Sequence, residues 1–130
     1  MIVFGSGVSM IAIKEMEKML KGPSEKLVHT IFTSREIAYC TRKRNRSEHF
    51  AARYAAKEAC LKALGLHSDR SVFLKIEVIR KPSGQPSLRI QEDLLKGTPW
   101  RNAQCDLSMA HERDVAIAFV LFSKNHASLR

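Results

Sequence analysis

The segment from residue 50 to residue 65 constrains the fold most, because it predicts a helix that is apolar or small around most of its circumference. Its sequence, FAARYAAKEACLKALG, consists mainly of strong helix formers. At helical spacing, four alanines form a row of small residues suited to close packing: Ala52, Ala56, Ala59 and Ala63. A helix of this kind is normally buried, so we expect it to lie in the core.

The same helix carries four charges in two pairs at i,i+4 spacing, Arg53 with Lys57 and Glu58 with Lys62. At roughly 100° per residue, the second pair shares one narrow arc and the first pair lies about 140° away. Two interpretations are open. The charges form exposed ion pairs, each worth about 0.2–0.5 kcal/mol to the helix, or the helix presents them to a ligand, because buried charges are costly unless they are paired or used.

The net charge of +9, from 22 basic and 13 acidic residues, predicts a negatively charged partner: nucleic acid, a phosphorylated metabolite, an acidic protein or an anionic membrane. A length of 130 residues fits one domain with a real core, so we expect a single domain over residues 1–130 with a frayed tail at 124–130. The densest basic run, Arg42 to Arg46, fits a solvated helix end or a binding surface.

The three cysteines, Cys40, Cys60 and Cys105, are odd in number and widely spaced, which favours neither a disulfide framework nor a zinc site. We therefore expect a reducing, cytoplasmic setting. The N-terminal residues lack the pattern of a secretory signal. No stretch approaches the roughly 18 apolar residues of a membrane span, so we expect no membrane insertion.

Local patterns predict helices in the first part of the chain and antiparallel strands in the second, which is typical of the α+β class. In the first part we expect a strand at 2–4 that ends at the glycines of 5–7, followed by a helix at 10–21 with Ser9 as its cap and Gly22-Pro23 as its stop. A short helix follows, capped by Thr33 or Ser34, with Glu36 in a capping-box position. The long helix then begins near Ser47. In the second part we expect strands at 72–79, 88–90 and 104–109, a turn at 82–86, a helical turn at 92–96 and a central strand at 115–122 covered on both faces.

Two blocks of sequence resemble the holo-acyl-carrier-protein synthase family, the small 4′-phosphopantetheinyl transferases. The first runs from Arg53 to Gly65 and follows the specific pattern R-(F/W/Y)-A-x-K-E-A-x-x-K-A, and the second runs from Leu107 to Glu112. Further blocks follow in the family's order: Gly5-Ser6-Gly7, Ile31-Phe32-Thr33 with Glu36, Ile76-Glu77-Val78 and Gly84-Gln85-Pro86. The resemblance covers the chain nearly end to end.

The resemblance implies the family's fold, a small antiparallel sheet packed against a long helix, and a homotrimer with active sites in clefts between subunits. It implies an enzyme of fatty acid biosynthesis that moves the 4′-phosphopantetheine arm of coenzyme A onto a serine of apo acyl carrier protein. Adenosine 3′,5′-bisphosphate is left behind, and the cofactor is Mg²⁺. The expected partners are coenzyme A and an acidic acyl carrier protein, with neither nucleic acid nor membrane.

The resemblance also assigns roles to residues. Glu58 becomes a catalytic residue and metal ligand, and Lys62 a catalytic residue that neutralises diphosphate charge, because phosphate-transfer catalysis depends on positioning and charge stabilisation. The implied coenzyme-binding residues are Arg53, Lys57, Gly65, Gly84, Pro86, Ser108 and His111. For Arg53, Lys57, Ser108 and His111 a structural role stays open. Gln85 stands where the family's G-K-P loop has lysine, so one positive charge is missing there.

One departure from the family concerns the metal. The opening motif is G-x-G-x-D followed by Ile or Val, and its aspartate is a principal metal ligand; here Ser9 takes that place. Ala12 also replaces a glutamate that is common a few residues later. A serine hydroxyl can ligate Mg²⁺ but brings no negative charge. We therefore expect Glu58 and Ser9 as metal ligands, and three accounts stay open: full activity, weakened activity with an altered metal requirement, or a degenerate relative that binds coenzyme A or carrier protein without transfer. For Ser9 itself, a purely structural role also stays open, in which it only caps the first helix.

Three lysines follow i, i+4, i+7 spacing and would share one helix face: Lys14, Lys18 and Lys21. This face would steer and dock an acidic carrier protein, or it is simply solvated. A nucleic-acid-binding module is the remaining function that the charge suggests. It is disfavoured, because the interleaved aromatic residues of a single-strand binder are absent.

Overall fold

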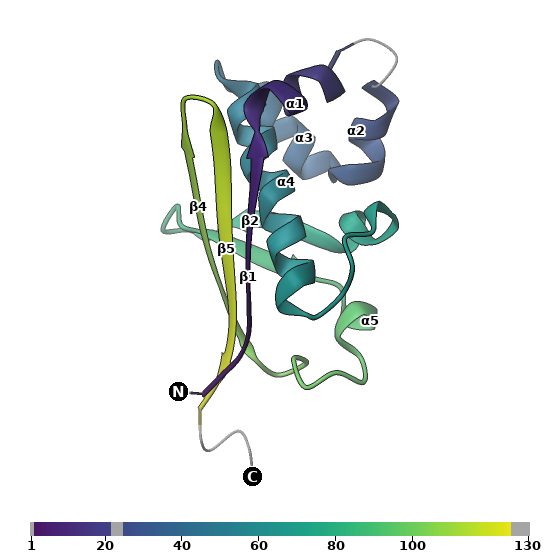
Figure 1. Ribbon diagram of the computed structural model, residues 1–130, viewed down its shortest axis with the longest axis vertical. Helices are drawn as coiled ribbons and strands as arrows, with labels where there is room; N and C mark the ends of the chain where they lie inside the picture. Colours follow the sequence, from purple (N-terminus) through teal and green to yellow (C-terminus); the bar gives the residue numbers. More distant parts are fainter. Residues whose placement is uncertain (1, 22–24, 126–130) are drawn as a thin grey trace.

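A computed structural model describes residues 2–21 and 25–125 and shows two antiparallel sheets with helices (Figure 1). The larger sheet has the strand order β1-β5-β4 and the smaller one pairs β2 with β3. The strands are β1 (Ile2–Ala12), β2 (Ile76–Arg80), β3 (Pro86–Ile90), β4 (Gln104–Glu112) and β5 (Val115–Lys124). The helices are α1 (Ile13–Met19), α2 (Glu25–Ile31), α3 (Ser34–Thr41), α4 (Arg46–Ala63), the 3₁₀ helix Arg70–Lys75 and α5 (Glu92–Leu95). The predicted α+β class with antiparallel sheets is confirmed.

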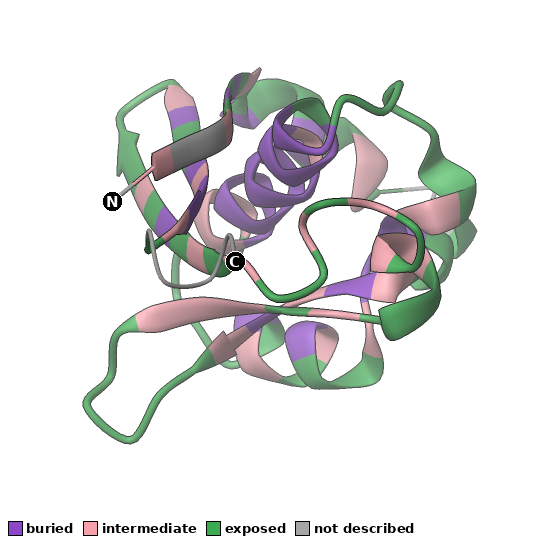
Figure 2. Cartoon of the chain, turned by 90° about the horizontal axis from the view of Figure 1, so that it is seen from below, coloured by how far each residue is buried: buried purple, intermediate pink, exposed green. Residues whose placement is uncertain are grey.

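Helix α4 lies at the centre of the molecule and packs against β1 and β5. Figure 2 shows it buried along most of its length, and all four alanines of the small row are buried. Two glycines of β1 allow the close approach. A Cβ atom at Gly5 would lie 2.3 Å from the backbone oxygen of Ala63, and one at Gly7 would lie 2.1 Å from that of Ala59. Any side chain at these positions would push the strand off the helix.

The first third of the chain differs from the sequence prediction. Strand β1 does not end at the glycines but continues to Ala12, because it pairs with β5 along its length, Gly7 opposite Val120 and Ser9 opposite Ala118. The prediction that Ser9 caps a helix is therefore wrong. Helix α1 begins at Ile13 behind Ala12, which makes no side-chain cap bond, and it ends at Met19, before the predicted stop at 22–23, which lies outside the described residues.

The predicted capping box at α3 is confirmed. Thr33 donates its backbone N–H to Glu36 Oε1 at 2.9 Å, and the Thr33 hydroxyl accepts from the Glu36 N–H at 3.3 Å. The two bonds satisfy backbone donors that a helix start otherwise leaves unpaired. Glu36 is thereby held in a fixed position inside the molecule.

The strand predicted at 72–79 is shorter, because the 3₁₀ helix before β2 buries Phe73 completely. Strand β5 is central, as predicted, but it is not covered on both faces. Ile117 is 39% and Phe119 44% exposed, while Ala116, Ala118 and Val120 are fully buried. Lys124 belongs to β5 rather than to a frayed tail, and residues 126–130 are outside the description. Among the described residues, no helix has the length and hydropathy to cross a bilayer.

A buried ion pair joins the helices to the small sheet. The Lys57 ammonium lies 2.7 Å from Glu36 Oε1 and donates to the backbone oxygens of Ile31 at 2.7 Å and Phe73 at 3.0 Å. The other carboxylate oxygen of Glu36 accepts the Val78 N–H at 2.8 Å. Desolvation lowers the pKa of Lys57, and the Glu36 charge opposes that shift. Because an ammonium has three donors and each meets a partner, the prediction that Lys57 binds a coenzyme phosphate is wrong.

We expect Lys57→Met to reduce the free energy of unfolding by about 3–5 kcal/mol, because it leaves the Glu36 carboxylate buried without its partner. Urea unfolding followed by circular dichroism measures this. Lys26→Met is the matched control: Lys26 is exposed on α2, and its change should stay within about 0.5 kcal/mol. The double variant Glu36→Gln/Lys57→Met should recover part of the loss. If Lys57→Met and Lys26→Met lowered the free energy of unfolding by the same small amount, the assignment of Lys57 to a buried ion pair would be contradicted.

Candidate active site

The Glu58 carboxylate is held by two serine hydroxyls. Ser9 Oγ on β1 donates to Glu58 Oε1 at 2.9 Å, and Ser68 Oγ in the loop after α4 donates to Glu58 Oε2 at 3.2 Å. Ser9 faces α4 and is 5% exposed, while Glu58 is half-buried. The structure thus brings together the two residues that were predicted as metal ligands. Ser68 was missed, because no spacing rule relates a loop serine to a helix carboxylate ten residues earlier.

Lys62 lies beside the same stretch of β1. Its ammonium donates to the backbone oxygen of Val8 at 3.0 Å, next to Ser9. Lys62 is exposed, so its charge is open to a ligand. Glu58 and Lys62 therefore both make hydrogen bonds to β1 from one arc of α4, at the neighbouring residues Ser9 and Val8.

The donor set around Glu58 fits Mg²⁺ only in part. Mg²⁺ prefers hard oxygen ligands and is commonly held by one or two carboxylates together with substrate phosphates and water. Glu58 supplies one carboxylate, and Ser9 and Ser68 supply neutral oxygens. Within residues 2–21 and 25–125, no three His, Cys, Asp or Glu side chains group in a way that could hold a metal. The residues fit a cation that shares its coordination with a phosphorylated ligand.

A cationic cavity lies on another side of α4, between α3 and the β2–β3 hairpin. Its volume is about 390 Å³, within the range of small-molecule sites. The lining residues that the structure describes include five arginines and no acidic side chain: Arg35, Arg42, Arg53, Arg80 and Arg89. The net positive charge of this lining suits an anionic ligand.

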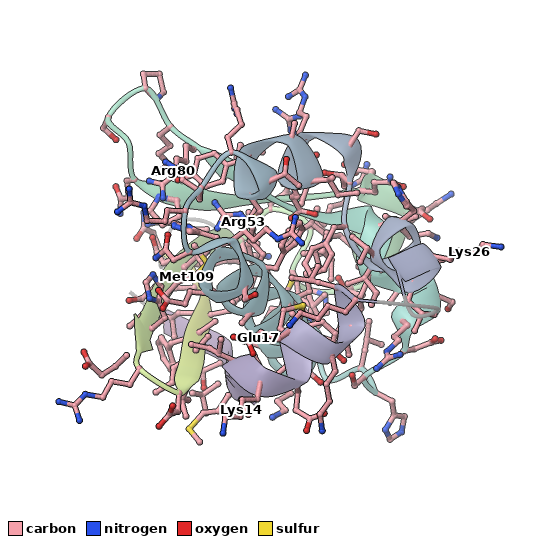
Figure 3. All side chains as sticks on the ribbon, turned by 90° about the horizontal axis from the view of Figure 1, so that it is seen from above. Lys14, Glu17, Lys26, Arg53, Arg80 and Met109 are labelled. Carbon is pink, nitrogen blue, oxygen red and sulfur yellow. The ribbon has the colours of Figure 1, made fainter. Side chains whose placement is uncertain are left out.

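Arg53 is the most constrained of these arginines. It is 3% exposed, and its buried Nε has no hydrogen-bond partner among the described residues. Its guanidinium lies over the Tyr39 ring at 4.3 Å, and that of Arg80 lies near the same ring at 5.0 Å. Figure 3 shows Arg53 and Arg80 in the same part of the molecule. The predicted Arg53 is thus in a ligand-sized cavity; Tyr39 and Arg80 were missed, because their sequence neighbours give them no distinguishing pattern.

His111 lies near this cavity at the end of β4. Its Nδ1 is 3.0 Å from Glu48 Oε2, and its ring packs edge-on against His49, with ring centroids 5.6 Å apart. His49 in turn contacts Tyr39 at 5.8 Å. Desolvation, followed by the charges of Arg53 and His111, lowers the pKa of His49. The structural contact of His111 with Glu48 does not exclude a ligand, since the His111 side chain is 33% exposed.

The other predicted coenzyme-binding residues occupy different places. Gly84 adopts a positive φ of 90° in the β2–β3 turn, and its oxygen accepts from Arg80 at 2.6 Å. Pro86 opens β3 opposite Arg80, so both residues lie next to the cationic cavity. Gly65 follows α4 with a positive φ of 75°. Ser108 is exposed on β4 opposite Phe119, on the outer face of the larger sheet.

The three predicted docking lysines, Lys14, Lys18 and Lys21, are all exposed on or just after α1. Lys18 also pairs with Glu15 at 3.8 Å. In Figure 3, Lys14 lies on α1, away from the side that carries Arg53 and Arg80. The basic face of α1 is thus separate from the cationic cavity.

Comparison with known proteins shows the family to which the chain is similar. Residues 6–120 match the family described as the 4′-phosphopantetheinyl transferase superfamily. The chain is 38% identical over 128 residues to a holo-acyl-carrier-protein synthase of Cytophaga hutchinsonii, covering 95% of this chain and all of the relative. It is 34% identical over 127 residues to one from a Geobacter strain, with the same two coverages.

Solved structures agree as well. The synthase of Bacillus anthracis in complex with coenzyme A (3′,5′-ADP) superposes with a TM-score of 0.75 at 30% identity, covering 94% of this chain and 97% of the other. The Helicobacter pylori synthase in complex with coenzyme A gives a TM-score of 0.77 at 28% identity, covering 91% and 99%. The sequence blocks, the fold and these matches lead to one conclusion: the chain belongs to the 4′-phosphopantetheinyl transferase superfamily.

Proposed function

We propose that the protein is a holo-acyl-carrier-protein synthase that moves the 4′-phosphopantetheine arm of coenzyme A onto a serine of apo acyl carrier protein. The observation that carries the proposal is the meeting of Glu58 and Lys62 at β1, in the family's order of sequence blocks. A non-catalytic relative that binds coenzyme A is the less favoured alternative, because both charged groups are retained and Lys62 is open to solvent. The reaction supports fatty acid biosynthesis.

The chemistry follows from charge. The carrier serine oxygen bonds to the phosphorus that bears the pantetheine arm, and that phosphorus loses its bond to the bridging oxygen of the diphosphate. Adenosine 3′,5′-bisphosphate leaves, and the serine proton is released. Negative charge grows on the leaving phosphate, so Lys62 stabilises it as a point charge. Mg²⁺, held by Glu58 and Ser9, supplies further charge neutralisation when it is bound.

The cationic cavity supports coenzyme A as the substrate. Coenzyme A carries a diphosphate and a separate 3′-phosphate, and α4 presents cationic groups in two places, Arg53 in the cavity and Lys62 beside β1. Arg53 and Glu58 are five residues apart, which places them about 7.5 Å apart along the helix axis and about 140° around it. We assign the 3′-phosphate of coenzyme A to Arg53, with Arg80 and Tyr39 beside it and His111 at the edge of the cavity. Arg80 supplies a positive charge next to the turn in which Gln85 stands in place of the family's lysine.

We further propose a homotrimer, with the active sites in clefts between subunits, in the cytoplasm. The outer face of β1 and β5 exposes four large apolar side chains: Val8 at 53%, Met10 at 64%, Ile117 at 39% and Phe119 at 44%. The register pairs Val8 with Phe119 and Met10 with Ile117, so they form one patch. Apolar patches of this kind mark association surfaces. The three free thiols suit a reducing compartment.

The proposed carrier protein is acidic and docks on the basic face of α1. The three lysines there are exposed, and none of them lines the cationic cavity. Complementary charge speeds the encounter of two proteins more than it tightens the final complex. The lysines therefore serve approach and orientation.

The function is tested by mass spectrometry of apo acyl carrier protein incubated with coenzyme A, Mg²⁺ and this protein. The carrier should gain the mass of the phosphopantetheine arm. Glu58→Gln and Lys62→Met should each lower kcat by about 100-fold or more, because they remove charge that acts on the reacting diphosphate, while Lys26→Met should not change it. Absence of transfer at high enzyme concentration, with several carriers and divalent metals, would refute the proposal.

Charge reversal tests the docking face. Lys14→Glu/Lys18→Glu should raise KM for apo carrier protein by about tenfold or more at low salt with little change in kcat, because electrostatic steering raises on-rates by about 10–10³. The effect should shrink as salt is added. Lys26→Glu/Lys96→Glu changes the same charge at exposed sites elsewhere. An identical KM for the two double variants would exclude this docking surface.

The trimer is tested by sedimentation equilibrium. The unmodified protein should show three times the mass of the chain, and Ile117→Lys/Phe119→Lys should shift it to monomer by placing charge in the interface. Leu74→Lys is the matched control, because Leu74 is 41% exposed on the 3₁₀ helix, away from the patch. A monomeric unmodified protein at micromolar concentration would contradict the proposal.

A further inference from the structure

The group of side chains around Glu58 has no net negative charge. Glu58 contributes one negative charge, and the ammonium of Lys62, which donates to Val8 beside Ser9, contributes one positive charge. Ser9 and Ser68 contribute hydroxyls only. A second carboxylate, which would tip the balance, is missing where Ser9 stands. The free protein therefore offers a divalent cation little electrostatic attraction.

The two serines still shape the site. Their hydroxyls donate to different oxygens of the same carboxylate, that of the buried Ser9 at 2.9 Å and that of the loop residue Ser68 at 3.2 Å. Two such bonds fix both the position and the rotation of a carboxylate that is otherwise half-exposed. Each hydroxyl keeps lone pairs after donating its hydrogen, so Ser9 can approach a cation without releasing Glu58. The serines thus orient the carboxylate but do not add to its charge.

Mg²⁺ gives up its water reluctantly, and ligand charge count is one of the factors that tune the affinity of protein sites for divalent cations. The diphosphate of the coenzyme brings the anionic oxygens that the free protein lacks. Lys62 also repels a lone cation, but it attracts a diphosphate. Both effects favour the entry of the metal together with the diphosphate over the entry of the metal alone.

We propose that the free protein does not hold a divalent cation at Glu58, and that the cation binds there only together with the diphosphate of the coenzyme. Ser9 and Ser68 are positioning residues that hold the Glu58 carboxylate ready for this joint binding. The inference rests on the proposed function for the identity of the diphosphate ligand.

Mn²⁺ is the probe, because electron paramagnetic resonance measures its free concentration directly. Three samples are titrated: metal-free protein, metal-free protein saturated with coenzyme A, and coenzyme A alone. The protein with coenzyme A should bind Mn²⁺ at least about tenfold more tightly than either component alone, as expected when the ligand supplies the missing charge. Equal affinity of the free protein and its coenzyme complex would overturn the proposal.

The missing carboxylate is tested by restoring it. Ser9→Asp should raise the Mn²⁺ affinity of the free protein by about tenfold or more, because a second anionic ligand then faces the cation. Ser6→Asp is the matched control. Ser6 is exposed on the same strand and lies on its opposite face, so it adds the same charge without joining the site. If Ser9→Asp binds Mn²⁺ no better than Ser6→Asp, the charge argument fails.

The positioning role of Ser68 has its own readout. Ser68→Ala should weaken Mn²⁺ binding to the coenzyme complex, leave metal-free coenzyme binding by calorimetry unchanged and leave Tm unchanged, and Ser68→Thr should restore the metal affinity. A loop residue with a purely structural role would lower Tm and coenzyme binding together. That outcome, or unchanged metal affinity in Ser68→Ala, would remove Ser68 from the site.

The test separates this inference from the proposed function. Transfer to a carrier protein is scored by mass, whereas joint binding is scored by Mn²⁺ and coenzyme titrations that need no turnover. Metal-first binding with normal transfer would overturn the inference alone. Joint binding without transfer would overturn the function alone.

Discussion

The close approach of helix α4 to strand β1 is the constraint on which the rest of the structure depends. It requires small residues on both sides, and the chain supplies alanines on the helix and Gly5 and Gly7 on the strand. The glycine positions leave about 2 Å between a hypothetical Cβ and the helix backbone, so no larger residue fits. Because the strand lies against the helix, Ser9 reaches Glu58 and the Val8 oxygen reaches Lys62. The arrangement of the candidate active site is a consequence of backbone packing.

Four charged residues of α4, at positions 53, 57, 58 and 62, serve different purposes, although they look alike in the sequence. Lys57 points into the core and ties the helix to Glu36, the 3₁₀ helix and β2. Arg53 points to a cavity with five arginines, and Glu58 and Lys62 point to β1. A buried pair such as Glu36–Lys57 contributes little net stability but is costly to break. It therefore fixes how α4 is rotated, and that rotation decides which charges remain open to ligands.

The charge balance of the site distinguishes this chain from the family pattern that its sequence resembles. With one carboxylate and two hydroxyls, the candidate site has one anionic group fewer than the family pattern, which has aspartate where Ser9 stands. In the cationic cavity, the guanidinium groups of Arg53 and Arg80 both lie near the Tyr39 ring, whereas Gln85 in the adjacent turn brings no charge. The arginines of the cavity lining thus supply the positive charge that suits an anionic ligand.

Much of the fold and part of the site followed from local patterns. The helical spacing of alanines predicted a buried helix, and the capping box at Thr33 followed from two residues at fixed spacing. The resemblance to a family motif singled out Arg53, Lys57, Glu58 and Lys62. The misses have a common cause. Because glycine often ends a strand, the predicted first strand was shorter than the observed β1. In the structure, Gly5 and Gly7 instead allow β1 to pack closely against α4. An unbroken apolar run predicts a strand that is buried on both faces. In β5, however, α4 covers one face and no other element of the described chain covers the face that carries Ile117 and Phe119.

The sequence by itself determined which segments bury apolar surface and which residue types are available for phosphate chemistry, because both depend on composition and short-range spacing. Only the tertiary structure decided that Lys57 is internal while Arg53 lines a cavity, and that Ser68 joins Ser9 on Glu58. These outcomes depend on the rotation of α4 and on contacts between residues 10 to 49 positions apart. Spacing within one helix cannot specify them, because each arc of the helix meets a different, distant part of the chain.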